Sequence, residues 1–262
     1  WSDYPWPDFG PNTNSFVNVL LEDYTGHRCP GCPAAATEAI NIETANPGRV
    51  IVLSVHASVG DGFQWVSTPG DGEYPKYSED FTTEEGDAYV TDIPGFFGNP
   101  CGMINRMPYN GGSPFNISIA TWANETANIL STNDLKINLQ QELNYYSSTN
   151  GLYIHVEAEA MEQVSANVSL VTCIVEKDFV AYQKDGGTDI SSYHHHNVFR
   201  GTITGAYGEP IFSSANTGDK FQLDLSYKIP TQFLDSNLMI VTYAMNLDNY
   251  EIYHVVGSNV IP

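Results

Sequence analysis

The chain has 262 residues, 42% of them hydrophobic, which is enough to bury a substantial core. Its 31 Asp and Glu residues outnumber its 10 Lys and Arg residues, giving a formal net charge of −21. So acidic a chain is a poor ligand for nucleic acid or an anionic membrane, and we expect protein partners or self-association instead. No run of about 18 apolar residues occurs, so we expect no transmembrane segment.

The first 15 residues are expected to form an N-terminal arm that is rich in aromatic residues and proline. The apolar run FVNVLLEDY at 16–24 predicts a buried strand, and PAAATEAINIETAN at 33–46 predicts a helix. RVIVLSVHAS at 49–58 predicts a second strand. This strand–helix–strand order predicts parallel pairing with a right-handed crossover.

The next part of the chain contains fewer regular signals. Residues 59–93 are rich in Gly, Asp, Pro and Tyr and predict an insertion, with a short acidic helix at 78–90. A short strand is predicted at 101–106. Apolar residues recur on one helical face between 116 and 131, which predicts a further helix.

From about residue 133 the pattern changes to short alternating segments with turn signals between them, such as Asn150–Gly151. About seven such strands predict an antiparallel β-sandwich that occupies residues 133–262. The fold class that we predict is therefore α+β, with an α/β domain at 16–132 followed by this sandwich domain.

The stretch GHRCPGCP at 26–33 carries the chemistry most specific to this chain. A C-x-x-C pair between a strand and a helix places Cys29 at the helix N-terminus, where free N–H groups and the helix dipole favour a thiolate. His27 and Arg28 are expected to add positive charge nearby, and Cys32 would be the buried resolving thiol. This context indicates a thioredoxin-like domain.

Other interpretations of the pair need different residues. A structural zinc site needs four ligands, usually from two such pairs, and only one pair is present. A c-type haem needs His directly after the second cysteine, where Pro33 stands. A static disulfide between Cys29 and Cys32 remains an open alternative to a redox-active dithiol.

A proline supports the thioredoxin-like prediction. In such domains a cis proline opens the next strand and faces the dithiol, and Pro100 in GNPCGMINR occupies that place, with Pro94 as the rival. Cys101 follows this proline and either modulates the dithiol or packs in the core. If the dithiol is redox-active, the catalytic set is Cys29, Cys32 and Pro100.

Several other residues resemble metal ligands. His194, His195 and His196 are consecutive, and neighbours on a strand point to opposite faces, so they cannot all bind one ion. We expect His196 to be buried and hydrogen-bonded. Acidic loops could supply oxygen ligands to calcium, yet none has EF-hand spacing. We therefore assign no metal and no cofactor, with calcium as the weaker alternative; the loop residues concerned are Asp61, Asp71, Asp185 and Asp189.

Three stretches resemble, in this order, landmarks of the Omp28-related outer-membrane protein family of Bacteroidota: LLEDYTGHRCPGCPAAA, NPCGMINR and HHHNVFRGTITGAYGEPI. The resemblance spans about residues 16–258. It implies an exported protein with a thioredoxin-like domain joined to a C-terminal β-sandwich, either anchored in the outer membrane or secreted. Because residue 1 is not a cysteine that could be acylated, we expect a lipid anchor upstream of Trp1, or secretion.

Two functions fit these features. The preferred hypothesis is a surface or outer-membrane accessory protein that binds other proteins or self-assembles and has a structural disulfide in its CPGC turn. The alternative is an extracytoplasmic thiol–disulfide oxidoreductase in which Cys29 attacks, Cys32 resolves and Pro100 shapes the substrate groove. The exposure of the Cys29 sulfur, or its cover by the 59–93 insertion, bears directly on this choice.

Overall fold

The computed structural model describes residues 7, 9–60 and 62–261, and it has a mixed α+β fold. Its first half contains, in chain order, β1 (Val19–Thr25), α1 (Cys32–Ala45), β2 (Val50–His56), α2 (Glu84–Asp92), β3 (Cys101–Ile104) and α3 (Trp122–Thr132). No helix in the described ranges is long and apolar enough to cross a bilayer.

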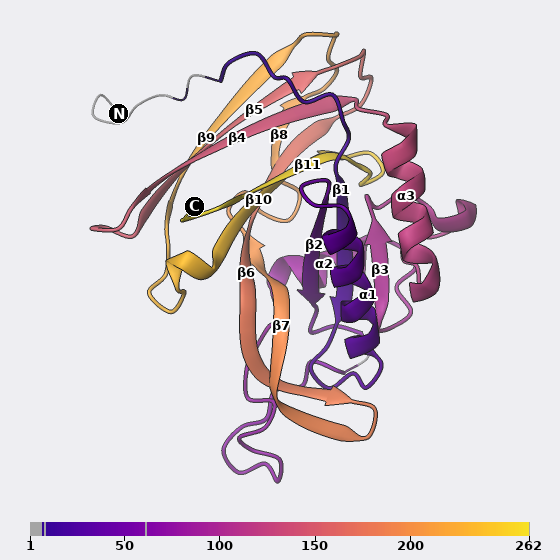
Figure 1. The fold of residues 1–262 in the computed structure, drawn as a ribbon, viewed down its shortest axis with the longest axis vertical. Helices are drawn as coiled ribbons and strands as arrows, with labels where there is room; N and C mark the ends of the chain where they lie inside the picture. The colour runs from indigo at the N-terminus through magenta and orange to yellow at the C-terminus, as the bar shows by residue number, and fades with distance from the viewer. Residues whose placement is uncertain (1–6, 8, 61, 262) are drawn as a thin grey trace.

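Strand β1 is the centre of this half. It runs parallel to β2, with Val19 opposite Val50, and antiparallel to β3, with Tyr24 opposite Cys101. Helices α1 and α3 cover one face of these strands (Figure 1), and Ala35, Ile42 and other small or apolar residues of α1 pack there. The predicted β–α–β unit is therefore confirmed, with α1 as its crossover.

The second half is built from strands, which are β4 (Ile137–Tyr146), β5 (Gly151–Ala160), β6 (Val168–Asp185), β7 (Thr188–Thr202), β8 (Glu209–Phe212), β9 (Lys220–Lys228), β10 (Leu238–Asn246) and β11 (Ile252–Asn259). Strands β4, β5 and β9 form an antiparallel sheet. Their inward side chains, such as Ile154 and Val156, pack against Leu170 of β6 and Ile240 of β10, which gives the predicted sandwich.

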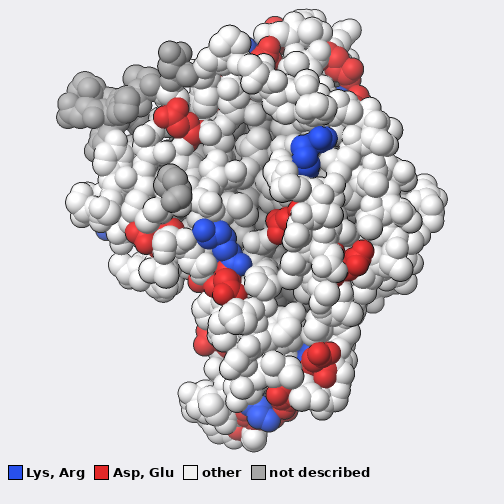
Figure 2. Space-filling model, viewed as in Figure 1, with Lys and Arg blue, Asp and Glu red and all other residues white. Residues whose placement is uncertain are grey.

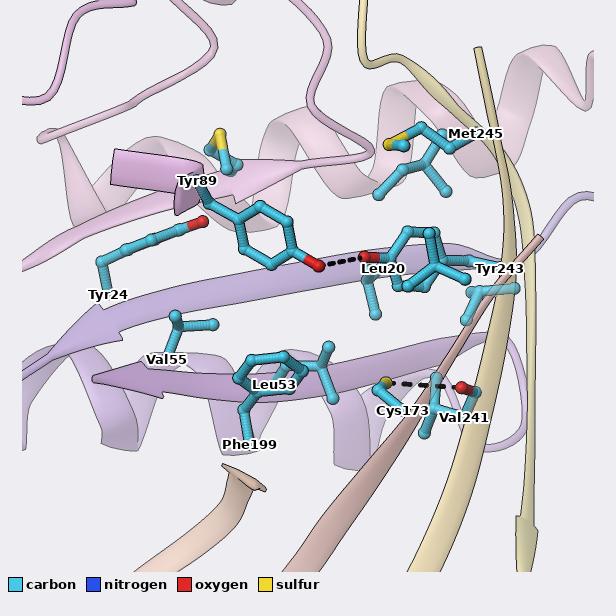
Figure 3. Close-up of a cluster of buried hydrophobic side chains, with 14 of the residues drawn as sticks. Leu20, Tyr24, Leu53, Val55, Tyr89, Cys173, Phe199, Val241, Tyr243 and Met245 are labelled. Carbon is cyan, nitrogen blue, oxygen red and sulfur yellow. Dashed lines mark hydrogen bonds between the residues drawn. The ribbon is translucent and has the colours of Figure 1, made fainter. Parts of the chain in front are cut away.

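The two halves share one hydrogen-bonded sheet. Its strand order is β11-β10-β6-β7-β2-β1-β3, and β2 meets β7 in parallel where Ser54 lies opposite Val198. One buried cluster contains Leu20 and Leu53 of the first half together with Val241 and Tyr243 of the second (Figure 3). The domain boundary at residue 133 stays a prediction, and the segments on its two sides bury a common core.

Two helices begin later than their sequence patterns indicate. Thr83 caps α2 by accepting a hydrogen bond from the Gly86 amide, so the residues before it form a loop. A 3₁₀ turn at Ile119–Thr121 precedes α3, because Asn116 bonds the Thr121 hydroxyl and accepts the indole N–H of Trp122 at its carbonyl.

A buried ion pair lies inside the shared core. The Arg106 guanidinium donates to both carboxylate oxygens of Glu22, at 2.8 and 2.7 Å, and both side chains are at most 1% exposed. Arg106 also lies over the rings of Tyr89 and Tyr243, at 4.2 and 5.5 Å from their centroids. The pair therefore joins β1, the segment after β3, α2 and β10.

We expect Glu22→Gln to lower the free energy of unfolding by about 3–5 kcal/mol, because it leaves the Arg106 cation buried without its counter-charge. Urea denaturation measures this change. Asp134→Asn is the matched control: Asp134 lies 3.5 Å from Lys136 and is 62% exposed, so its loss should cost less than about 1 kcal/mol. Equal effects of the two substitutions would contradict the assignment.

Candidate functional site

Cys29 and Cys32 form a disulfide at the start of α1. Their Cα atoms are 5.4 Å apart, and each residue is only 1% exposed. Gly31 precedes the helix without a side-chain cap, and Pro33 occupies its first turn, where a missing N–H costs nothing. The CPGC turn therefore has the strand-to-helix position that the sequence predicts, and its sulfur atoms are not open to solvent.

Pro100 faces this turn. The Asn99–Pro100 peptide bond is cis, whereas Pro94 does not follow a cis bond. A Cβ built on Gly31 would lie 3.7 Å from Pro100 Cδ, so the proline ring contacts the disulfide loop directly. The structure thus brings Cys29, Cys32 and Pro100 together. Cys101 points instead into the shared core beside Tyr24, as a buried thiol.

The tip of the β6–β7 hairpin covers the disulfide loop. The Lys184 amide donates to the His27 carbonyl at 2.8 Å, and the Gly186 amide donates to the Pro30 carbonyl at 2.9 Å. The buried Gln183 side chain donates to the carbonyls of Gly26 and Cys29, each at 3.1 Å. Figure 1 shows this hairpin leaving the sandwich and bending toward the α1 end of the first half.

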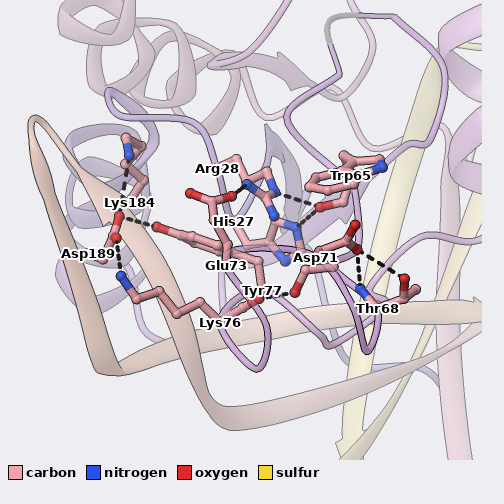
Figure 4. Close-up of polar contacts among 11 residues, drawn as sticks. His27, Arg28, Trp65, Thr68, Asp71, Glu73, Lys76, Tyr77, Lys184 and Asp189 are labelled. Carbon is pink, nitrogen blue, oxygen red and sulfur yellow. Dashed lines mark hydrogen bonds and ion pairs between the residues drawn. The ribbon is translucent and has the colours of Figure 1, made fainter.

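The 59–93 segment covers the loop from another side. The Arg28 amide donates to the Phe63 carbonyl, and the Arg28 guanidinium lies between the rings of Trp65 and Tyr77, at 4.6 and 4.4 Å (Figure 4). Its Nη1 donates to Glu73 Oε2 at 2.5 Å. Arg28 therefore anchors the insertion, and its charge is balanced by a carboxylate.

Asp189, at the base of the hairpin turn, connects the two covering segments. Its carboxylate accepts from Lys76 Nζ at 2.9 Å, from the Tyr77 hydroxyl at 2.5 Å and from Lys184 Nζ at 3.3 Å (Figure 4). These donors hold the pKa of Asp189 well below its usual range. We call these four residues the Asp189 latch.

A small cavity lies beneath the disulfide. Its volume is about 20 Å³, and its lining includes Cys32, Asp23, His56 and His195. Neither carboxylate oxygen of Asp23 has a hydrogen-bond partner in the described part of the chain. Burial raises the pKa of Asp23 to about 7, because the charged form is poorly solvated there. Asp23 and Cys32 thus line the same small cavity.

Three buried histidines surround Phe81 of the insertion. The ring centroids of His27, His56 and His195 lie 5.9, 4.9 and 4.8 Å from that of Phe81. Burial lowers the pKa of His27 and of His195 to about 4, and it also holds the pKa of His56 well below its usual range. His27 is therefore neutral at pH 7, and the expectation that it adds positive charge beside Cys29 is wrong.

The predicted alternation of the three consecutive histidines is confirmed, but its phase is different. His195 is the buried one, while the rings of His194 and His196 stack on the exposed face near Asp178. The expectation that His196 is buried is thus wrong, because the register of β7 on β6 turns His195 toward Phe81.

The loop carboxylates named for calcium have other contacts. Asp189 binds two lysines, and Asp71 accepts from the amide and hydroxyl of Thr68. Asp185 lies at the exposed hairpin tip, and Asp61 lies outside the described residues. Within the described ranges, no group of three or more His, Cys, Asp or Glu residues is placed to hold a metal ion.

Sequence reasoning missed Asp23, His56 and the β6–β7 cap. The first of these has a local signal, since Asp23 is an acid inside the apolar run VLLEDYT, where all seven residues are buried. His56 ends the second apolar strand in the same way. The cap has no local signal, because Gln183 lies 154 residues from Cys29.

The chain was compared with protein-family models, curated protein sequences and solved structures. The family model described as outer membrane protein Omp28 matches residues 88–261. HBP35 of Porphyromonas gingivalis has a similar fold, with a TM-score of 0.70 at 15% identity over 95% of this chain and 76% of that one. Protein AGR_C_4864 from Agrobacterium tumefaciens gives 0.52 at 12% identity over 94% and 95%. These identities show the fold alone. No curated protein sequence matched the chain.

We expect Asp23→Asn to stabilise the protein more at pH 8 than at pH 5. The folded pKa of about 7 exceeds the unfolded value, so the wild type loses stability as pH rises toward 7. The variant lacks this loss, so its free energy of unfolding relative to the wild type should increase by about 3 kcal/mol between pH 5 and 8. Urea midpoints across this range test it, and a constant difference would contradict it.

The buried histidines predict that stability changes with pH in the opposite direction to the effect of Asp23. Because the folded pKa values lie below the unfolded value of about 6.5, the stability that these residues contribute at pH 7 is lost as pH falls toward 4. His195→Gln should remove up to about 1.4 kcal/mol per pH unit of that loss. His194→Gln, on the exposed face of the same strand, is the control and should leave most of the slope in place.

Proposed function

The chain belongs to the Omp28 outer membrane protein family, and on this premise we propose that it is an extracytoplasmic accessory protein that binds other proteins. In this proposal the protein is held at the outer-membrane surface or secreted, and the disulfide between Cys29 and Cys32 is a structural staple. The observation that carries the staple is the cover over both cysteines, each only 1% exposed. Thiol exchange needs direct access of a thiolate to one sulfur atom.

The described surface supports protein contact rather than binding of polyanions. Figure 2 shows carboxylates scattered over the viewed face, with only isolated cationic side chains. Large apolar side chains are also exposed on the described surface, including Phe97 at 85%, Ile117 at 62% and Trp65 at 53%. Such side chains supply the apolar area on which protein interfaces depend.

The cavity beneath the disulfide favours a second function, a thiol–disulfide oxidoreductase. A structural disulfide has no need of a buried carboxyl with a raised pKa, and Asp23 shares its cavity with Cys32. In the reduced protein, the Cys29 thiolate would attack a substrate disulfide and release one substrate thiol. Cys32, deprotonated by Asp23, would then attack Cys29 and release the second. The protein becomes oxidised as the substrate gains two electrons and two protons.

The two functions predict different effects of replacing the cysteines on stability and on the rate of insulin reduction. As a staple, the four-residue loop should contribute about 2 kcal/mol, so Cys29→Ser with Cys32→Ser should lower the free energy of unfolding by this amount. Added to insulin and dithiothreitol, the oxidised wild type and the double variant should then give the same rate of insulin reduction. Faster reduction by the wild type, abolished by Cys29→Ser alone, would overturn the staple and support the oxidoreductase.

A further inference from the structure

We propose that the tip of the β6–β7 hairpin is a displaceable cap on the disulfide, and that the Asp189 latch controls how often it opens. In the closed state that the structure shows, Cys29 is inaccessible to thiols. In the open state, the hairpin tip no longer covers the loop, and the Cys29 sulfur becomes accessible. The redox consequence of opening rests on the oxidoreductase candidate above, whereas the control of access does not.

The hairpin is held unequally along its length. The sandwich end of β6, from Val168 to Glu176, is buried in both cores. The distal end is more exposed: Val180 is 51% exposed, and residues 185–188 at the turn are all exposed. Local opening takes place where few apolar contacts resist it. Phe179, Tyr182 and His195 pack against aromatic rings of the insertion, so the part that can separate is the tip beyond Tyr182, while the rest of the hairpin stays in place.

The cap contacts the loop mainly through polar groups. The amides of Lys184 and Gly186 bond the carbonyls of His27 and Pro30. Gly186 lies in the hairpin turn with a φ of 55°, and both acceptors lie in turns, so these are turn-to-turn contacts. Both loop carbonyls lose these donors when the cap leaves.

The Asp189 latch supplies the charged part of this closure. Its donors come from both covering segments, Lys76 and Tyr77 from the insertion and Lys184 from the hairpin itself. The hydrogen bonds from Lys76 and Tyr77 cross from the insertion to the hairpin and must break on opening, whereas the Lys184 contact lies within the hairpin and moves with it. Hydrogen bonds to charged groups are stronger than neutral ones, so the two crossing bonds favour the closed state. The side chains of Lys76 and Asp189 are partly exposed, so breaking the contact between them need not disturb the core.

The test measures how fast dithiothreitol reduces the disulfide of the folded, full chain. A reagent thiolate attacks one protein sulfur and displaces the other as a thiolate, and the second reagent thiol then closes to the cyclic disulfide, leaving two protein thiols. Since only the open state reacts, the observed rate scales with its population. Quenched aliquots are alkylated, and the number of alkylated thiols is read from the mass of the protein. Amide hydrogen exchange of residues 183–190 is measured in parallel.

We expect Asp189→Asn to increase both the reduction rate and the exchange of the Lys184 and Gly186 amides by about tenfold. Asp185→Asn, a loss of the same charge at the exposed tip, should change neither. Tyr77→Phe removes one hydroxyl from the latch and should give a smaller increase of about threefold. If Asp189→Asn lowers the urea midpoint of the whole protein, Tyr77→Phe becomes the variant that tests whether the latch controls opening.

The outcomes separate the cap from the catalytic function. Unchanged reduction rates in Asp189→Asn and Tyr77→Phe, or faster amide exchange without faster reduction, would overturn the cap. Faster reduction in both latch variants supports it. If Asp189→Asn is reduced faster and still fails to accelerate insulin reduction, the cap stands and the oxidoreductase candidate fails.

Discussion

The Arg106–Glu22 pair lies at the point where every layer of this fold meets. A guanidinium at 0% exposure is tolerated only when its charge and its donors are satisfied, and here two carboxylate oxygens and two aromatic rings do so. These groups come from β1, α2 and β10. The pair can form only when the thioredoxin-like strands and the sandwich strands are correctly assembled together, so it makes the shared core specific as well as compact.

That shared core explains how the disulfide comes to be covered. Because β6 and β10 are fixed against β1 through the cluster around Tyr243, the direction in which the β6–β7 hairpin leaves the core is fixed as well. The pairing of Ser54 with Val198 and the hydrogen bond from Ser54 Oγ to the His196 carbonyl bring β7 alongside β2, and the hairpin then continues to the CPGC turn. The strands of the second half thus supply a part of the site that the first half alone lacks.

Local sequence signals were sufficient for the parts of the site that are local. The dithiol turn and α1 are predicted because each depends on residues within a few positions of one another. The place of Pro100 against this turn is a long-range contact, and it is predicted only from the pattern of thioredoxin-like domains. The histidine phase and the cap could not be predicted in this way. A shift of one residue in strand register exchanges the two faces. The pairing partner of His195 is Phe179 in the same hairpin, but Phe81, against which the buried face packs, lies far away in the chain. The buried strands β1 and β6 also lack alternation, because both of their faces are covered.

Asp23 remains the residue that a purely structural disulfide does not explain. Burying a carboxyl without a partner costs free energy, and the neutral form that the raised pKa favours reduces this cost without removing it. His56 and His195, which line the same cavity, add further buried ring nitrogens without a partner in the described part of the chain. Groups that destabilise a fold are most often kept where chemistry needs them. The covered cysteines argue for a resting staple, and the buried carboxyl argues for exchange. A cap that opens satisfies both observations, because the same disulfide is then inert when closed and reactive when the hairpin is displaced.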